Sequence, residues 1–214
     1  PPIILGVVHS PLVPRSNDVV TVTARFLDES TGVRAQLYWR LDGTKDFQSV
    51  PMSDAGPPVD RTPSDGRFTA QIPAHPEGSI IEFYVAAEDP DGLRRTWPAP
   101  AQVAGALVQS LNALYQVDGG VANNSKGVGN LPLYRVVLTA ADRQELADIN
   151  RNLGFSAQSH AQFNATFIAE DAVYVGVVGV TPDGRPILAP GVKSYLHISA
   201  DGALSTRPPS GPKS

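Results

Sequence analysis

The sequence contains no cysteine, which excludes disulfide frameworks, thiolate zinc sites, iron–sulfur clusters and cysteine nucleophiles. It has no apolar run near the roughly 18 residues of a membrane span, and no basic segment followed by an apolar stretch after Pro1. We therefore expect neither a spanning helix nor a retained signal peptide. The chain does not begin with methionine, and we expect a processed protein or a piece of a longer one.

Blocks of like charge are also missing, and the formal net charge is −4. A nucleic-acid partner is therefore not expected, because such partners require a basic patch. The motifs of serine hydrolases, phosphate-loop enzymes and dinucleotide-binding enzymes do not occur. His9, His75, His160 and His197 lie in separate segments without metal-ligand spacing, so we expect surface or loop-packing histidines rather than a zinc site.

The first hundred residues consist of short alternating apolar and polar runs separated by turn clusters, which is typical of an all-β sandwich. In residues 33–41, for example, Leu37 and Trp39 share one face while Tyr38 and Arg40 share the other. The expected strands are residues 3–8, 18–27, 33–41, 47–52, 68–72, 81–87 and 93–97.

Beyond about residue 103 the pattern changes. The stretch 104–130 is mixed, with a candidate short helix or strand at 107–117, and its small, polar second half is expected to be an exposed connector. After a strand near 133–138, Thr139 and Asp142 have the spacing of a helix N-terminal cap. We expect that helix to run to about residue 152 and to stop at Gly154, with further strands at 163–167, 172–180 and 192–199.

These patterns predict a mainly β chain with an N-terminal immunoglobulin-like or fibronectin-type-III-like β-sandwich and a small α+β domain. The predicted divisions are the sandwich at 1–103, the connector at 104–130, the α+β domain at 131–204 and a low-complexity, disordered or extended tail at 205–214.

The loop at residues 54–66 contains three carboxylates, which makes it a candidate calcium site. Asp54, Asp60 and Asp65 would supply the hard oxygen ligands that Ca²⁺ prefers. Their spacing matches no ordered calcium loop, and the alternative is that each carboxylate bonds nearby backbone N–H groups in an Asx-turn. No other cofactor is expected from the residues themselves.

Several strings resemble one family of secreted bacterial proteins. Residues 65–74 (DGRFTAQIPA) and 81–89 (IEFYVAAED) resemble the immunoglobulin-like module that precedes the kinase-like domain in the CotH (spore-coat kinase) family. Residues 112–118 (NALYQVD) are similar to the linker of those proteins. Residues 133–143 (LYRVVLTAADR) and 164–168 (NATFI) are similar to the start of their kinase-like domain.

This resemblance implies phosphorylation of proteins with ATP and a divalent ion such as Mg²⁺. It aligns Lys193, in the expected strand at 192–199, with the family's nucleotide-facing lysine. Residues 178–185, which precede that strand, depart from the family pattern. The family's catalytic and metal-binding acidic residues lie further downstream, beyond Ser214. ATP and Mg²⁺ are therefore expected only if a further kinase half exists.

The leading functional prediction is a non-catalytic structural or interaction module, secreted or at the cell surface. Its expected partner is another protein, including copies of itself. One alternative is the N-terminal fragment of a CotH-type protein kinase, with Lys193 as its nucleotide-binding residue. The other is a carbohydrate-binding module, which would need exposed, coplanar aromatic rings, for which Tyr38, Tyr84 and Trp97 are the candidates.

Overall fold

The fold is known from a computed structural model. It describes residues 1–29, 31–56, 59–60, 62–103, 105–109, 111–119, 134–153, 162–169, 172–180, 186–188, 197–198 and 204–205. The chain divides into two compact units. One unit comprises residues 1–137 and 166–175, and the other comprises residues 138–165 and 176–214.

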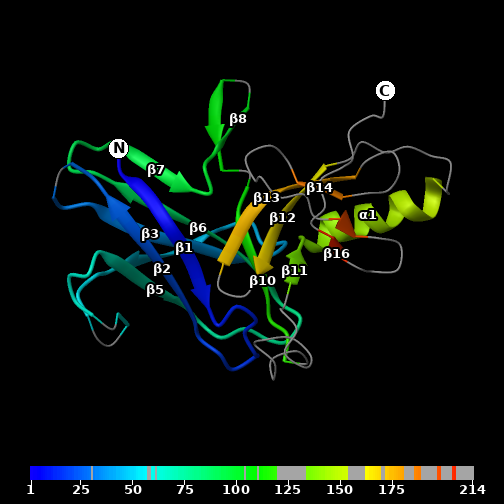
Figure 1. The fold of residues 1–214 in the computed structure, drawn as a ribbon, viewed down its shortest axis with the longest axis horizontal. Coiled ribbons are helices and arrows are strands. Elements are labelled where there is room, and N and C mark those ends of the chain that lie inside the picture. Colours follow the sequence, from blue (N-terminus) through cyan, green and yellow to red (C-terminus); the bar gives the residue numbers. More distant parts are fainter. Residues whose placement is uncertain are drawn as a thin grey trace. The chain divides into compact units, whose positions relative to one another are not determined.

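The first hundred residues form a β-sandwich, as the alternating pattern predicts (Figure 1). All seven expected strands are present close to their predicted bounds. They are β1 (Ile3–Ser10), β2 (Val20–Leu27), β3 (Arg34–Leu41), β4 (Gln48–Met52), β5 (Arg67–Ile72), β6 (Ile80–Glu88) and β7 (Arg94–Trp97).

Two antiparallel sheets make up the sandwich. The smaller sheet has the order β1-β2-β5, and the larger has the order β10-β6-β3-β4, with β7 also paired to β6. The strand β10 (Ala113–Gln116) lies within residues 107–117, the part of the predicted connector where a short helix or strand is expected. It joins the sandwich because Ala113, Leu114 and Tyr115 are all apolar or aromatic and all buried. A short ribbon, β8 (Ala101–Val103) and β9 (Ala106–Val108), precedes it.

The strand β1 is an edge strand, which agrees with the prolines that follow it at positions 11 and 14. Its register with β2 shifts between Leu5 and Val8, so one residue of β1 bulges from the ladder. Gly6 lies within this shift with a φ of 57°, a conformation that favours glycine.

The core lies between the two sheets and follows the predicted alternation. The inward residues of β3 are Ala35, Leu37 and Trp39, and all three are buried. The same holds on β6, whose apolar inward positions 81, 83, 85 and 87 are almost inaccessible. Because each large buried side chain contributes roughly 1.5–3 kcal/mol, this shared interior supplies the main stabilisation of the sandwich.

The segment after β10 adds a further, four-stranded sheet with the order β11-β12-β13-β14. Its strands are β11 (Tyr134–Val137), β12 (Gln162–Ala169), β13 (Ala172–Val180) and β14 (Pro186–Leu188), and a ribbon of β15 (His197–Ile198) and β16 (Leu204–Ser205) follows. The buried Thr166 of β12 accepts the backbone N–H of Leu114 through Oγ1 at 2.6 Å. This hydrogen bond, together with buried Val137 of β11 and Ile168 of β12, joins the part of this sheet that belongs to the first unit to the core of that unit.

The predicted helix is present as α1 (Ala140–Leu153). Its cap is confirmed, because the Oγ1 of Thr139 accepts the backbone N–H of Asp142 at 3.1 Å. The predicted stop at Gly154, the second half of the connector and the tail beyond residue 205 lie outside the described residues. The described residues include no helix with the length and hydrophobicity that crossing a bilayer requires.

His9 departs from the expectation that the histidines are surface or loop residues. It is 2% exposed. Its ring stacks on that of Tyr115 with centroids 5.1 Å apart, and it meets the ring of Phe83 edge-to-face with centroids 5.8 Å apart. Burial lowers the pKa of His9 to about 4, against a weak opposing effect of the hydrogen bond to the Leu12 carbonyl. The folded protein therefore keeps His9 neutral where an unfolded chain would protonate it.

This burial predicts a specific loss of stability in acid. The contribution of neutral His9 is fully present above pH 6.5 and is lost progressively as the pH falls to about 4. Between pH 7 and pH 4.5 the unfolding free energy of the parent chain should fall by about 2 kcal/mol more than that of His9→Gln, because the variant lacks the titrating ring. Urea unfolding at the two pH values measures this. His75→Gln is the comparison: burial also lowers the pKa of the half-buried His75, but less than that of His9, so His75→Gln should change the acid loss in the same direction by a smaller amount. Equal losses in the parent chain and His9→Gln would contradict the assignment.

Candidate functional site

The outer face of the larger sheet carries a cluster of three aromatic side chains. Tyr38 of β3 and Tyr84 of β6 are direct cross-strand neighbours. Their rings stack with centroids 4.7 Å apart and planes 3° apart, and Phe47 meets Tyr84 edge-on at 5.1 Å. All three are half-buried, so this aromatic cluster (Tyr38, Phe47 and Tyr84) is an ordered and partly accessible feature of the sheet face.

Two arginines lie over the aromatic cluster. The guanidinium of Arg40 is 4.3 Å from the ring centre of Phe47, and that of Arg94 is 5.7 Å from the ring centre of Tyr38. Both distances are within the range of cation–π attraction. Burial raises the pKa of Tyr84, with Tyr38 adding to the rise and Arg94 opposing it, so its hydroxyl stays protonated at neutral pH and remains available as a donor.

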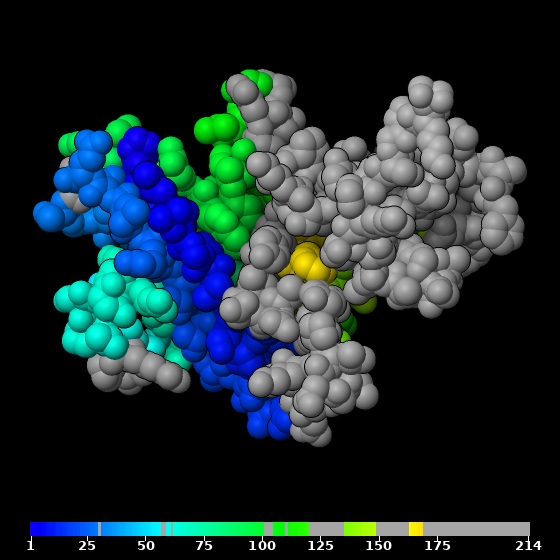
Figure 2. Space-filling model, viewed as in Figure 1, coloured from blue at the N-terminus to red at the C-terminus, as the bar shows by residue number. Residues whose placement is uncertain are grey.

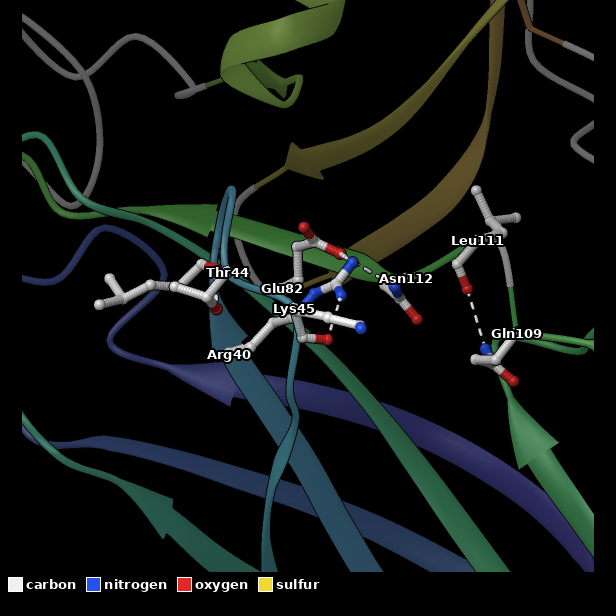
Figure 3. Close-up of polar contacts among 8 residues, drawn as sticks. Arg40, Thr44, Lys45, Glu82, Gln109, Leu111 and Asn112 are labelled. Atoms are coloured by element: carbon white, nitrogen blue, oxygen red, sulfur yellow. Dashed lines mark hydrogen bonds and ion pairs between the residues drawn. The ribbon is translucent and has the colours of Figure 1, made fainter.

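Beside the aromatic cluster, a network of hydrogen bonds that includes an ion pair connects side chains on the same face of the larger sheet (Figure 3). The carboxylate of Glu82 accepts hydrogen bonds from Arg40 Nη2 at 2.9 Å and from Asn112 Nδ2 at 3.0 Å. Arg40 also donates through Nη1 to the Lys45 carbonyl at 3.1 Å, which lies in the β3–β4 connection. Because the Glu82 side chain is only 8% exposed, this network keeps its buried charge compensated.

The three aromatic residues expected for sugar binding do not form one platform. Tyr38, Tyr84 and Trp97 are all half-buried, but Trp97 pairs in register with Val85, whose side chain belongs to the core. Its ring contacts core Phe83 at 6.5 Å. Tyr38 and Tyr84 turn one ring face toward each other, so those faces cannot also stack on a sugar.

The structure brings the three predicted calcium ligands together. Each of Asp54, Asp60 and Asp65 offers a carboxylate oxygen within 4.8 Å of the others. Asp60 is buried, Asp54 is half-buried and Asp65 is exposed. The donor set suits Ca²⁺ chemically, because all the ligand atoms are hard oxygens.

The same carboxylates already bind the backbone of their own loop. Asp54 accepts the N–H groups of Asp65 and Gly66 at 3.1 and 2.9 Å. Asp60 accepts the N–H groups of residues 56 and 62, and Asp65 accepts that of residue 67. Asp60 and Asp65 each accept the N–H two residues further along, as the Asx-turn alternative predicts, whereas Asp54 accepts N–H groups 11 and 12 residues away, which is not an Asx-turn. Calcium binding stays a prediction.

The remaining predicted site residue, Lys193, lies outside the described residues. Its role in nucleotide binding, and with it the ATP and Mg²⁺ expectation, stays a prediction. The sequence did not identify Phe47 as part of the aromatic cluster, nor Glu82 and Asn112 as part of the charged network beside it. Glu82 alternates with buried residues like any solvated strand position, and only the pairing of β3 with β6 brings it opposite Arg40.

These contacts predict that Asp54 is the structural centre of its loop. We expect Asp54→Ala to lower the unfolding free energy by about 1–3 kcal/mol, because two backbone N–H groups lose their acceptor. Asp65→Ala is the matched control, and it should cost less because it removes a single exposed hydrogen bond. Denaturant unfolding with chelator and with millimolar Ca²⁺ measures both effects. A rise in the stability of the parent chain with Ca²⁺ that Asp54→Ala abolishes would show a calcium site, whereas equal stability with chelator and with Ca²⁺ would leave the backbone hydrogen bonds as the role of these carboxylates.

Comparisons with known proteins give no family for this chain. No protein-family model matches it, and no curated protein matches it. One solved structure that it resembles is a cycloalternan-forming enzyme from Listeria monocytogenes in complex with a pentasaccharide substrate, at a TM-score of 0.36 and 12% sequence identity. That match covers 90% of this chain and 15% of the enzyme chain, so the chain spans a small part of that protein. The resemblance to the CotH family stays a prediction.

Proposed function

We propose that this chain is a non-catalytic interaction module, secreted or at the cell surface, that associates with a second copy through the outer face of its larger sheet. The observation that supports this most strongly is the aromatic cluster with the two arginines over it. Tyrosine and arginine dominate the binding energy of protein interfaces when they lie in ordered, partly desolvated positions.

The cluster is organised before any partner arrives. The stacking of Tyr38 on Tyr84 and the hydrogen bonds of Arg40 hold these side chains in one arrangement. Binding through them would therefore cost little rotamer entropy, roughly 0.5–1.5 kcal/mol less for each side chain already fixed.

A second copy is the favoured partner because the face carries both members of each kind of contact, namely cations with anions and cations with aromatic rings. Arg94 is exposed beside an aromatic ring, and the exposed Arg34–Glu88 ion pair at 3.2 Å supplies both charges. In a twofold interface, a residue of one subunit contacts a different residue of the second subunit, and the same pair occurs again with the subunits exchanged. A face that carries cations, anions and aromatic rings side by side can therefore be complementary to a second copy of itself.

This proposal predicts a concentration-dependent dimer. Light scattering or sedimentation velocity over a wide concentration range should show the mass rising from monomer toward dimer. We expect Tyr38→Ala to weaken the dimer about thirtyfold, as for an interface hot spot of about 2 kcal/mol, and Arg94→Ala to weaken it at least severalfold.

The matched control is Arg25→Ala, which removes an exposed arginine from β2 in the other sheet. It should leave dimerisation unchanged, and circular dichroism verifies that each variant is folded. A parent chain that stays monomeric at every concentration would contradict the proposal. So would an Arg25→Ala effect as large as that of Arg94→Ala.

A further inference from the structure

Two arginines lie side by side on the outer face of the smaller sheet. Arg25 of β2 and Arg67 of β5 are direct cross-strand partners, and both are exposed. Side chains directly opposite each other on one sheet face have Cβ atoms about 4.5–5.5 Å apart. On the core side of the same strands, the rings of Phe26 and Phe68 meet edge-to-face with centroids 5.0 Å apart. The backbone beneath this arginine pair (Arg25 and Arg67) is therefore held in place by core packing.

The charges of the arginine pair are not compensated within the part of the chain that the structure describes. Neither guanidinium forms an ion pair, a hydrogen bond or a cation–π contact with a described residue. By contrast, Arg34, Arg40 and Arg135 each pair with a carboxylate. Asp65 lies close in sequence, but its Oδ1 accepts the backbone N–H of Arg67 at 2.9 Å. The two guanidinium groups are therefore available to another molecule.

The arginine pair departs from the usual pairing of charges across strands, because like charges directly opposite each other destabilise a sheet. In natural proteins, departures from such local rules are expected at functional sites. An anion between the two guanidinium groups would remove their repulsion. Each guanidinium presents a planar fork of N–H donors that matches the two oxygens of a carboxylate. The pair is therefore suited to a carboxylate that another molecule supplies.

An aliphatic side chain borders the arginine pair. Leu5 of the edge strand β1 is the cross-strand neighbour of Arg25 on the side away from Arg67, and it is 45% exposed. In the space-filling view β1 is the dark blue band on the surface (Figure 2). The row that crosses the three strands is therefore leucine, arginine, arginine. A molecule lying along this row would meet apolar surface at the edge of the sheet and positive charge beyond it.

The rows on either side of the arginine pair carry no charge. One contains Val8, Thr23 and Thr69, and the other contains Ile3 and Leu27. Nucleic acids and other polyanions gain their affinity from many cationic contacts along a backbone. Two cations between uncharged rows suit a short acidic contact instead, and Leu5 adds an apolar contact beside it.

We propose that the arginine pair binds an acidic segment of a partner protein, in which an aliphatic residue lies next to aspartate or glutamate. A carboxylate of the segment would accept hydrogen bonds from both guanidinium groups, and its aliphatic side chain would contact Leu5. A neutral apolar segment would leave the repulsion between the arginines in place. This site is on the smaller sheet, so it is separate from the proposed dimer contact on the larger sheet and does not rest on it.

The test uses the full chain and a capped, fluorescent Glu-Leu-Glu-Leu-Glu peptide, with Gln-Leu-Gln-Leu-Gln as the matched neutral peptide and a thymidine decanucleotide as the polyanion. Fluorescence anisotropy should show saturable binding of the acidic peptide alone, weakened by added salt. We expect Arg25→Gln and Arg67→Gln each to weaken binding about fivefold, and Leu5→Ser to weaken it about threefold. The control Arg143→Gln, which removes an exposed arginine from α1 in the other unit, should leave binding unchanged.

Amide chemical shifts locate the contact and should change for Arg25 and Arg67 but not for Tyr38 or Tyr84. Equal binding of the neutral peptide would overturn the proposal, because it would show that the carboxylates contribute nothing. Tighter binding of the decanucleotide would overturn it in favour of a polyanion site. An Arg143→Gln effect as large as that of Arg25→Gln, or no binding of the acidic peptide at all, would contradict it as well. Circular dichroism verifies that each variant is folded.

Discussion

The ion pair between Arg40 and Glu82 is the contact on which the outer face of the larger sheet depends. Glu82 is on β6, the strand that pairs with β3, β7 and β10, and its nearly buried carboxylate needs a compensating charge. Arg40 supplies that charge, binds the Lys45 carbonyl of the β3–β4 connection and lies over Phe47. Asn112 ties the start of β10 to the same carboxylate (Figure 3). One pair of side chains therefore organises three strands and the aromatic cluster.

The sheet face presents side chains whose positions are set by cross-strand register, so its contacts are rigid and extended. A scaffold that orders such a face before a partner arrives suits a module within an assembly.

Much of the sandwich could be predicted from the sequence, because a period of two residues identifies a strand and its inward face directly. The cap at Thr139 was equally local, since it involves a hydroxyl and an N–H three residues apart. The meeting of Asp54, Asp60 and Asp65 followed from their position in one loop. Glu82 and His9 could not be predicted, because burial of a polar residue depends on partners such as Arg40 and Tyr115 that are distant in sequence. Assignment of β10 to the sandwich likewise required its pairing with β6.

A double-mutant cycle on Arg40 and Glu82 tests the central claim most directly. Arg40→Leu, Glu82→Leu and the double variant would each be unfolded in denaturant and compared with the parent chain. Arg40→Leu leaves the 8%-exposed carboxylate of Glu82 without its charged partner and should cost about 3 kcal/mol, whereas Glu82→Leu should cost less because Arg40 is 25% exposed. The double change should cost clearly less than the sum of the two. Additive losses would show that Arg40 and Glu82 act independently, and the outer face would then lack the contact that we hold responsible for its order.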